Sequence, residues 1–286
     1  MPAGNGEARR FTAAERPAIA GESAGEGSPI VLCHGLTATR RSVVHGSRRL
    51  ERAGHTVVTY DARGHGESDP APMGEGYDYS ELAADLEAVL AGEVGEGPLV
   101  LGGHSMGAHT AVAYALRHPD RVAGLVVIGP SYAGPAEAAS LHYWDGLATA
   151  LQEDGIDGFV SYIDRSQGID PRWRDSVLRF TRERMERHRH LNALVVALRE
   201  VPRSRPFAAM SELEGLDVPA LVVASRDDAD PGHPYSVARE YAERLPRARL
   251  ISEVEGQSPL AWQGGRLSRE IADFCAEPAV AERLGA

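Results

Sequence analysis

The chain has 286 residues, a formal net charge of −11 and a sequence pI near 5.5. This length predicts one large domain, or one domain with a sizeable insertion, and the acidic balance argues against nucleic acid as a partner. The first residues lack the apolar run of a signal peptide, and no stretch is long enough to span a membrane, so we expect a cytoplasmic protein without a membrane partner. The oligomeric state stays open.

Short apolar, β-branched runs alternate with helical patterns along most of the chain. The segment 11–23 offers two weaker candidates for edge strands. The clearer predicted strands cover 29–33, 55–60, 99–103, 122–128, 219–224 and 248–254. Their nearly continuous apolar character is typical of strands that are covered on both faces. Alternation with helices predicts an α/β fold with a mostly parallel sheet.

This alternation stops between about residues 131 and 214. Three stretches there have helical patterns, and no convincing strand lies among them: 135–152, 171–190 and 191–201. We therefore expect a helical lid over 131–214, inserted into a core formed by 1–130 and 215–286.

The lid has two compositional features that bear on a ligand. Between Arg172 and Arg189 there are seven arginines and three acids, which fits either a solvated helix face or the attraction of an anionic substrate. Five aromatic residues would pack the lid helices together or line an apolar pocket: Tyr143, Trp144, Tyr162, Trp173 and Phe180.

The strongest chemical signal is the sequence "GHSMG" at 103–107, which fits the pattern G-x-S-x-G. It follows an apolar predicted strand and precedes a helical pattern, the context in which a nucleophilic serine stands on a sharp turn. Glycines two residues to either side of Ser105 let the neighbouring backbone approach without a clash. The following helix directs its first amides toward the site, which favours an oxyanion. Ser105 is the expected nucleophile.

Three further motifs make the chain similar to the α/β-hydrolase superfamily over nearly its whole length: "LCHGLTAT" at 32–39, "YDARGHGESD" at 60–69 and "PALVVASRDDADP" at 219–231. The resemblance implies the α/β-hydrolase fold, with a mostly parallel sheet flanked by helices and covered by a lid. It implies an oxyanion hole formed by the backbone amides of Leu36 and Met106. It also implies that His34 holds loops by hydrogen bonds, with substrate positioning as a second possible role.

The resemblance further implies that Asp227 is the acid of a catalytic triad, and Asp228 and Asp230 are close enough in sequence to be alternatives. The last motif departs from the family pattern, because Gln257 stands where the family has histidine. Glutamine does not titrate near neutral pH, so it cannot be a general base. We expect Gln257 instead to position substrate or water near Ser105.

Another histidine would have to serve as the base. Only His233 lies beyond Asp227, so it alone preserves the chain order Ser…Asp…His expected of this fold. His233 is then either oriented by Asp227 or Asp230, or a surface residue at the start of the next helix. His104 is a weaker candidate, because its side chain should point away from that of Ser105.

Together these residues predict a serine hydrolase that acts on a small ester, thioester or lactone, with an atypical triad of Ser105, Asp227 and His233. The alternative is a non-hydrolytic member of the family: a protein that binds a small molecule, or a cofactor-free lyase, cyclase or oxygenase. The sequence contains no recognisable zinc-type cluster, phosphate loop or dinucleotide motif, so no metal or cofactor is expected. The predicted partner is a small-molecule substrate, whose identity the lid would set.

Overall fold

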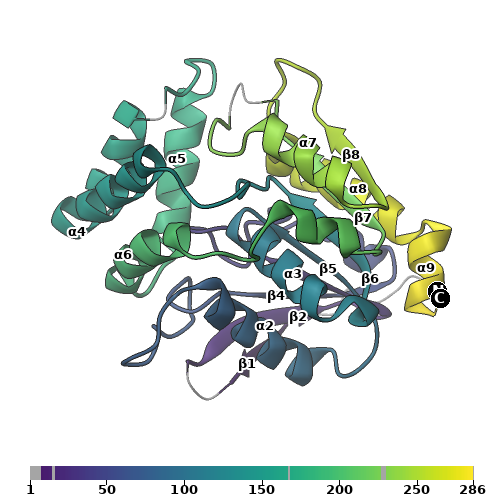
Figure 1. Ribbon diagram of the computed structural model, residues 1–286. Coiled ribbons are helices and arrows are strands. Elements are labelled where there is room, and N and C mark those ends of the chain that lie inside the picture. Colours follow the sequence, from purple (N-terminus) through teal and green to yellow (C-terminus); the bar gives the residue numbers. More distant parts are fainter. Residues whose placement is uncertain (1–7, 15–16, 167, 227–229, 286) are drawn as a thin grey trace.

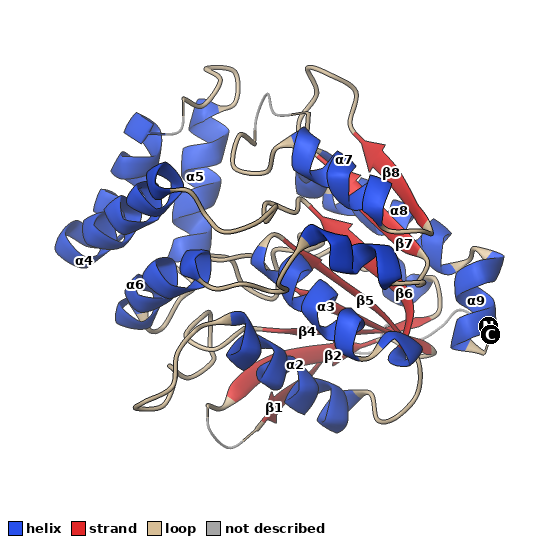
Figure 2. Cartoon of the chain, viewed as in Figure 1, coloured by secondary structure: helices blue, strands red, loops and turns tan. Residues whose placement is uncertain are grey.

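The computed structural model describes residues 8–14, 17–166, 168–226 and 230–285. Within them the chain forms an eight-stranded sheet between two layers of helices, and further helices stand to one side of it (Figures 1 and 2). The order is β1-β2-β4-β3-β5-β6-β7-β8, and only β1/β2 and β2/β4 are antiparallel pairs. The strands are β1 (Arg9–Ala13), β2 (Ile19–Ala24), β3 (Ser28–Cys33), β4 (His55–Tyr60), β5 (Leu99–His104), β6 (Val122–Ile128), β7 (Ala220–Ala224) and β8 (Ala248–Ser252). The predicted, mostly parallel α/β sheet is confirmed, and both weaker edge strands are present.

Helices cover both faces of the sheet with apolar side chains. One face packs against α2 (Tyr79–Glu93), α3 (Met106–Arg117) and α7 (Tyr235–Arg244). The other packs against α1 (Arg49–Arg52), α8 (Gly264–Cys275) and α9 (Pro278–Leu284). The central strands β5 and β6 are buried over nearly their whole length, as expected for strands with parallel neighbours on each side and helices on each face.

Three helices within the predicted lid segment form an apolar cluster of their own, and we use the name lid for these helices. They lie on the left in Figure 1 and are α4 (Ala138–Ser166), α5 (Arg174–Met185) and α6 (Leu191–Glu200). Leu151, Phe159 and Leu194 are among their buried contacts. The long helix α4 is interrupted at Gly155, whose φ of 62° is not helical.

A short segment at the end of the predicted lid range packs with the core. Phe207, Met210 and Leu213 fall within the predicted range 131–214, but they pack in the core cluster together with Tyr241 of α7. The helical lid therefore ends before Phe207. The apolar pattern of this short segment does not specify which of two clusters it joins, because that depends on tertiary packing.

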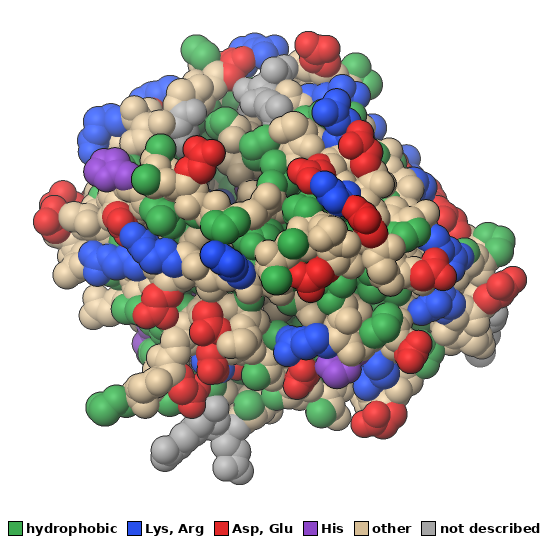
Figure 3. Space-filling model, viewed as in Figure 1, with side chains coloured by type: hydrophobic (Ala, Val, Ile, Leu, Met, Phe, Trp, Pro, Cys, Tyr) green, Lys and Arg blue, Asp and Glu red, His purple; other side chains and the backbone are tan. Residues whose placement is uncertain are grey.

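Charges of both signs are spread over the surface. In the view of Figure 3, acidic and basic side chains lie interspersed over lid and core alike. On this face the net charge of −11 is therefore not gathered into one acidic patch. Among the residues that the structure describes, no helix combines the length and the apolar character that a membrane span requires.

A buried ionic network joins the loop after β3 to the loop after β4. The backbone N–H of Arg40 donates to Asp61 Oδ1 at 2.7 Å, and its guanidinium pairs with Oδ2. The N–H of Glu67 donates to the same carboxylate at 3.0 Å. Asp61 has no exposed surface and Arg40 is 6% exposed. These contacts hold in place the loop that carries Leu36.

Replacing Asp61 with alanine should lower the free energy of unfolding by about 3 kcal/mol, because it leaves a buried guanidinium short of one carboxylate. Glu22 and Glu67 still contact Arg40, so the loss should stay near the lower end for a broken buried pair. Chemical denaturation followed by circular dichroism measures it. Glu214→Ala removes an exposed ion pair with Arg244 and should cost no more than about 1 kcal/mol. Equal losses in the two variants would contradict the prediction.

Candidate active site

Ser105 stands at the junction of β5 and α3 with an unusual backbone conformation. Its φ is 53° and its ψ is −117°, a region that residues with a side chain rarely occupy. A Cβ at position 103 or 107 would clash with neighbouring backbone, in the second case with the carbonyl of Cys33. The two glycines thus let β3, β5 and the start of α3 come together, and this turn presents the Ser105 side chain to the cavity described below.

The loop after β3 lies directly against Ser105. A Cβ on Gly35 would be 2.9 Å from His104 Nδ1 and 3.3 Å from Ser105 Cβ, so only glycine allows this approach. Leu36 follows on this loop, and Met106 is the first residue of α3. Within the described residues, the backbone N–H of neither Leu36 nor Met106 donates to a protein acceptor. Both amides are available beside the serine.

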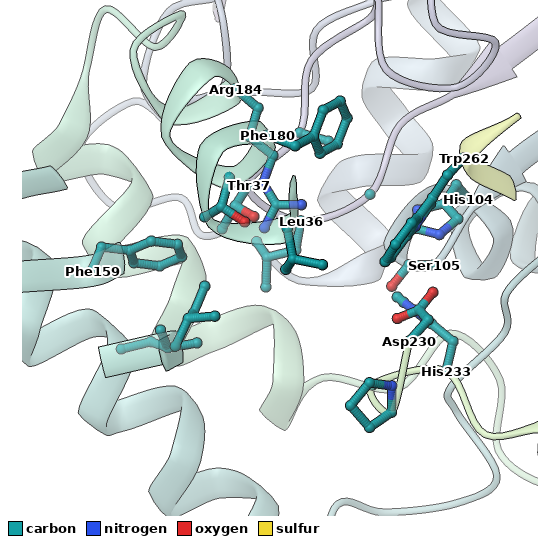
Figure 4. Close-up of a pocket in the computed structure, with 18 of the residues that line it drawn as sticks. Leu36, Thr37, His104, Ser105, Phe159, Phe180, Arg184, Asp230, His233 and Trp262 are labelled. Atoms are coloured by element: carbon teal, nitrogen blue, oxygen red, sulfur yellow. The ribbon is translucent and has the colours of Figure 1, made fainter. Parts of the chain in front are cut away.

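A histidine and a carboxylate reach the same place from the loop after β7. His233 Nδ1 lies 2.8 Å from Asp230 Oδ1, and the backbone N–H of His233 donates to the carbonyl of Asp230 at 3.1 Å. Both side chains line the same cavity as Ser105, and Figure 4 shows the Ser105 hydroxyl directed toward them. The His233 ring also packs against His104, with 4.7 Å between ring centroids. Asp227, the predicted acid, lies outside the described residues.

The Asp230–His233 pair has the electrostatics of an oriented base. Burial favours the neutral acid, but the charge and the hydrogen bond of His233 outweigh it and lower the pKa of Asp230. An ionised Asp230 accepts the Nδ1–H of His233. When Nδ1 carries the only ring proton, Nε2 is left as the acceptor nitrogen of His233.

His104 has no carboxylate partner among the described residues that would orient its ring as a base. Burial, reinforced by the neighbouring His233, lowers the pKa of His104 to about 3. Its Nε2 is buried without a hydrogen-bond partner among the described residues. His104, Asp230 and His233 also offer ligand atoms within 4.8 Å of one another, a spacing that could hold a metal ion. The hydrogen bond of Asp230 to His233 already engages one candidate atom of each, so the group fits an acid–base pair better than a chelate.

Two residues that the sequence suggested for substrate positioning lie elsewhere. Gln257 is exposed in the turn after β8, where its N–H donates to the carbonyl of Val254 at 3.0 Å, and it does not line the cavity. His34 is buried and uses both ring nitrogens, donating to Gly35 O at 2.8 Å and accepting from Ala62 N–H at 2.9 Å. Neither residue lines the cavity beside Ser105, so the structure gives no support to a positioning role for either one.

Ser105 opens into a cavity of about 410 Å³ between the core and the lid. This volume suits a small molecule. Most of its wall is apolar, and Figure 4 shows several of these side chains around the empty space. The apolar lining includes Leu36, Trp144, Leu147, Phe159, Ile163, Phe180 and Trp262.

A lid histidine ties the lid to the loop that carries Leu36. His188 lies in the turn between α5 and α6, where its Nδ1 accepts from Gly66 N–H at 2.8 Å. Its Nε2 donates to the carbonyl of Thr37 at 3.0 Å. Thr37 has a φ of 65°, so this contact supports a backbone conformation that threonine rarely adopts. One end of the lid and the residue after Leu36 are thereby joined.

Comparison with known proteins assigns the chain to a family. Residues 28–263 match the model of the α/β hydrolase fold, and the chain therefore belongs to this family. It is 30% identical over 218 residues to a 2-hydroxy-6-oxononadienedioate/2-hydroxy-6-oxononatrienedioate hydrolase of Pseudomonas putida, which covers 71% of this chain and 73% of that protein. It is 39% identical over 106 residues to an sn-1-specific diacylglycerol lipase of Mus musculus, covering 37% of this chain but only 33% of the lipase.

Solved structures share the fold. A thermophilic esterase from Thermogutta terrifontis superposes with a TM-score of 0.74 and 22% identity, over 93% of this chain and 97% of the esterase. An esterase from Exiguobacterium antarcticum superposes with a TM-score of 0.70 and 21% identity, over 93% of this chain and 98% of that esterase. At this level of identity the likeness concerns the fold alone. The α/β-hydrolase fold expected from the sequence is confirmed.

Proposed function

We propose that the protein is a serine hydrolase that acts on a small ester, thioester or lactone. Ser105 is the nucleophile, His233 the general base, and Asp230 the group that orients it. The observation that carries this proposal is the 2.8 Å contact between Asp230 and His233 in the cavity that Ser105 lines. The hydrolases among the relatives support an enzymatic role in general.

The reaction follows from the positions of these groups. His233 Nε2 takes the proton of the Ser105 hydroxyl as the oxygen attacks the carbonyl carbon, and Asp230 stabilises the resulting imidazolium. The amides of Leu36 and Met106 donate to the oxygen that becomes negative. His233 returns the proton to the leaving group, which departs and leaves an acyl-enzyme. A water molecule, deprotonated by the same histidine, then releases the acid.

A second candidate reaction is the hydrolysis of a carbon–carbon bond next to a ketone. The relative from Pseudomonas putida favours it, because the match spans 73% of a protein named for hydrolysis of a hydroxy-oxo-dienedioate. This reaction would use the same cavity and the same oxyanion donors. Parallel assays with esters and with a hydroxy-oxo-dienoate distinguish the two.

A fluorophosphonate probe tests the nucleophile directly. Intact-mass spectrometry should show one phosphonyl adduct on the wild type and none on Ser105→Ala. Ser131→Ala is the matched control, because Ser131 lines the same cavity but lies outside the β5–α3 turn, and it should still be labelled. An adduct that persists in Ser105→Ala, or no adduct on the wild type, would remove Ser105 from the mechanism.

A further inference from the structure

One lid arginine lines the cavity without a carboxylate partner. Arg184 lies on α5, and its side chain reaches toward Leu36 and Thr37, on the opposite side of the cavity from Ser105 (Figure 4). Its Nε is buried and has no hydrogen-bond partner among the described residues. Three other lid arginines form ion pairs: Arg172 with Asp170, Arg174 with Asp164 and Arg182 with Asp157. Arg179 is the second arginine of the cavity lining, but it is exposed to solvent.

The groups around the cavity do not neutralise this guanidinium. Asp230 attracts it, but that carboxylate already accepts from His233. Glu183 is exposed to solvent, and no ion pair joins it to Arg184 in the described structure. The remaining titratable groups of the lining are positive or neutral at neutral pH: His45, His104, Tyr143, Arg179 and His233.

An unpaired cation that is partly buried is costly, and the cost falls when an anion binds. Burial lowers the pKa of Arg184, yet a group this basic stays protonated at neutral pH. Its charge is partly desolvated, so its attraction for an anion is stronger than that of an arginine in water. The guanidinium has the planar fork that matches a carboxylate. Because Arg179 is exposed to solvent, Arg184 is the one partly buried arginine of the lining and balances one negative charge. A phosphate dianion would leave a second charge uncompensated beside the apolar wall.

We propose that Arg184 binds a carboxylate of the substrate, so that this hydrolase acts on compounds whose reactive carbonyl is separated from a carboxylate by an apolar spacer. The inference rests on the proposed function, because it sets the reactive carbonyl at Ser105. The spacer lies along the apolar side chains between the two ends of the cavity, such as Leu36 and Phe159. Arg184 is then a specificity-determining residue.

A pair of matched esters tests this. Mono-4-nitrophenyl adipate carries a free carboxylate, and its methyl ester has the same length without the charge. In the wild type, kcat/KM should be about 10–100-fold higher for the carboxylate, the range for a charge-assisted hydrogen bond. Arg184→Met should bring this ratio close to one, mainly through a higher KM for the charged ester. Arg184→Lys should keep part of the preference.

Arg187→Met is the control for charge, because Arg187 is an exposed arginine just beyond α5 that does not line the cavity. It should keep the wild-type ratio. A ratio near one in the wild type, or the same ratio in wild type and Arg184→Met, would overturn the inference while leaving ester hydrolysis intact.

Binding without turnover separates this inference from the proposed function. Monomethyl adipate should bind to the wild type in isothermal titration calorimetry and should bind about 10–100-fold more weakly to Arg184→Met. This result would support the carboxylate site even if no ester is hydrolysed. No measurable binding to the wild type, or equal binding of inorganic phosphate, would contradict it.

Discussion

Replacing His233 with alanine should slow the phosphonylation of Ser105 by about 10²–10⁴-fold, which is the usual contribution of a general base. The reason is that, in the proposed mechanism, Nε2 of His233 takes the serine proton, because Asp230 engages Nδ1. The measurement is the rate of fluorophosphonate labelling, followed by intact mass over time. Asp230→Asn should give a smaller loss, because the ring remains but its orientation and charge stabilisation weaken.

The matched control is Gln257→Ala, because the resemblance in sequence predicts a histidine at this position, whereas Gln257 is exposed and lies outside the cavity. Its labelling rate should stay close to that of the wild type. Equal rates in the wild type and in His233→Ala would rule out His233 as the base.

Stability should fall steeply as the pH drops from about 6.5 toward 5, the range in which unfolded histidines take up protons. Three buried histidines accept backbone N–H groups through a ring nitrogen that protonation would block. His34 accepts from Ala62, His188 from Gly66, and His109 from Ser131 and Tyr132. Burial is the main reason that the pKa of each is lowered to about 3.

The direction of this pH dependence follows from the thermodynamic linkage between protonation and folding. Each folded pKa lies below the unfolded value, so the stabilisation is complete above pH 6.5 and is lost as the pH falls toward 3. Each histidine should contribute a loss of about 1.4 kcal/mol per pH unit. The three together should remove about 6 kcal/mol at pH 5, which is comparable with the whole stability of many domains.

Urea unfolding at several pH values between 7.5 and 5 measures this slope. His188→Gln should be less stable than the wild type at pH 7.5, because a buried hydrogen bond is lost, but its stability should depend less on pH. The exposed His142→Gln is the control and should keep the wild-type slope. A free energy of unfolding that is constant from pH 7.5 to 5 would contradict the role given to these histidines.

The sheet and the position of Ser105 could be predicted because their signals are local. Strands that are buried on both faces need continuous apolar runs, and β5 and β6 are buried along most of their residues. The turn at Ser105 needs glycine at particular neighbouring positions, since a Cβ there would clash with the backbone. Both requirements act within a few residues and are visible in the sequence.

The acid–base pair depends on the path of a loop. Asp230 and His233 line the same cavity as Ser105, and the sequence left Asp227, Asp228 and Asp230 as alternatives for the acid. Chain order singled out His233, but its proximity to Ser105 is a tertiary property.

The sequence alone did not single out Arg184, because it is one of seven arginines between Arg172 and Arg189. A helical spacing could have distinguished it. Val177, Thr181 and Arg184 recur at i, i+4 and i+7, so they share a face of α5, and His188 continues this spacing into the turn that follows. Three of them line the cavity, and His188 is buried. The position of Arg184 at this spacing, among residues that face inward, is the feature of the sequence that could have indicated an arginine in the cavity.

The backbone conformation of Ser105 bears on the choice between a hydrolase and a protein that only binds a ligand. A serine at a φ of 53° destabilises the folded chain by about 1–3 kcal/mol, and glycine at this position would relieve that strain. A protein that only bound a ligand in this cavity could have glycine there and be more stable. The strained serine at this position therefore favours a function in which its oxygen takes part in a reaction over ligand binding alone.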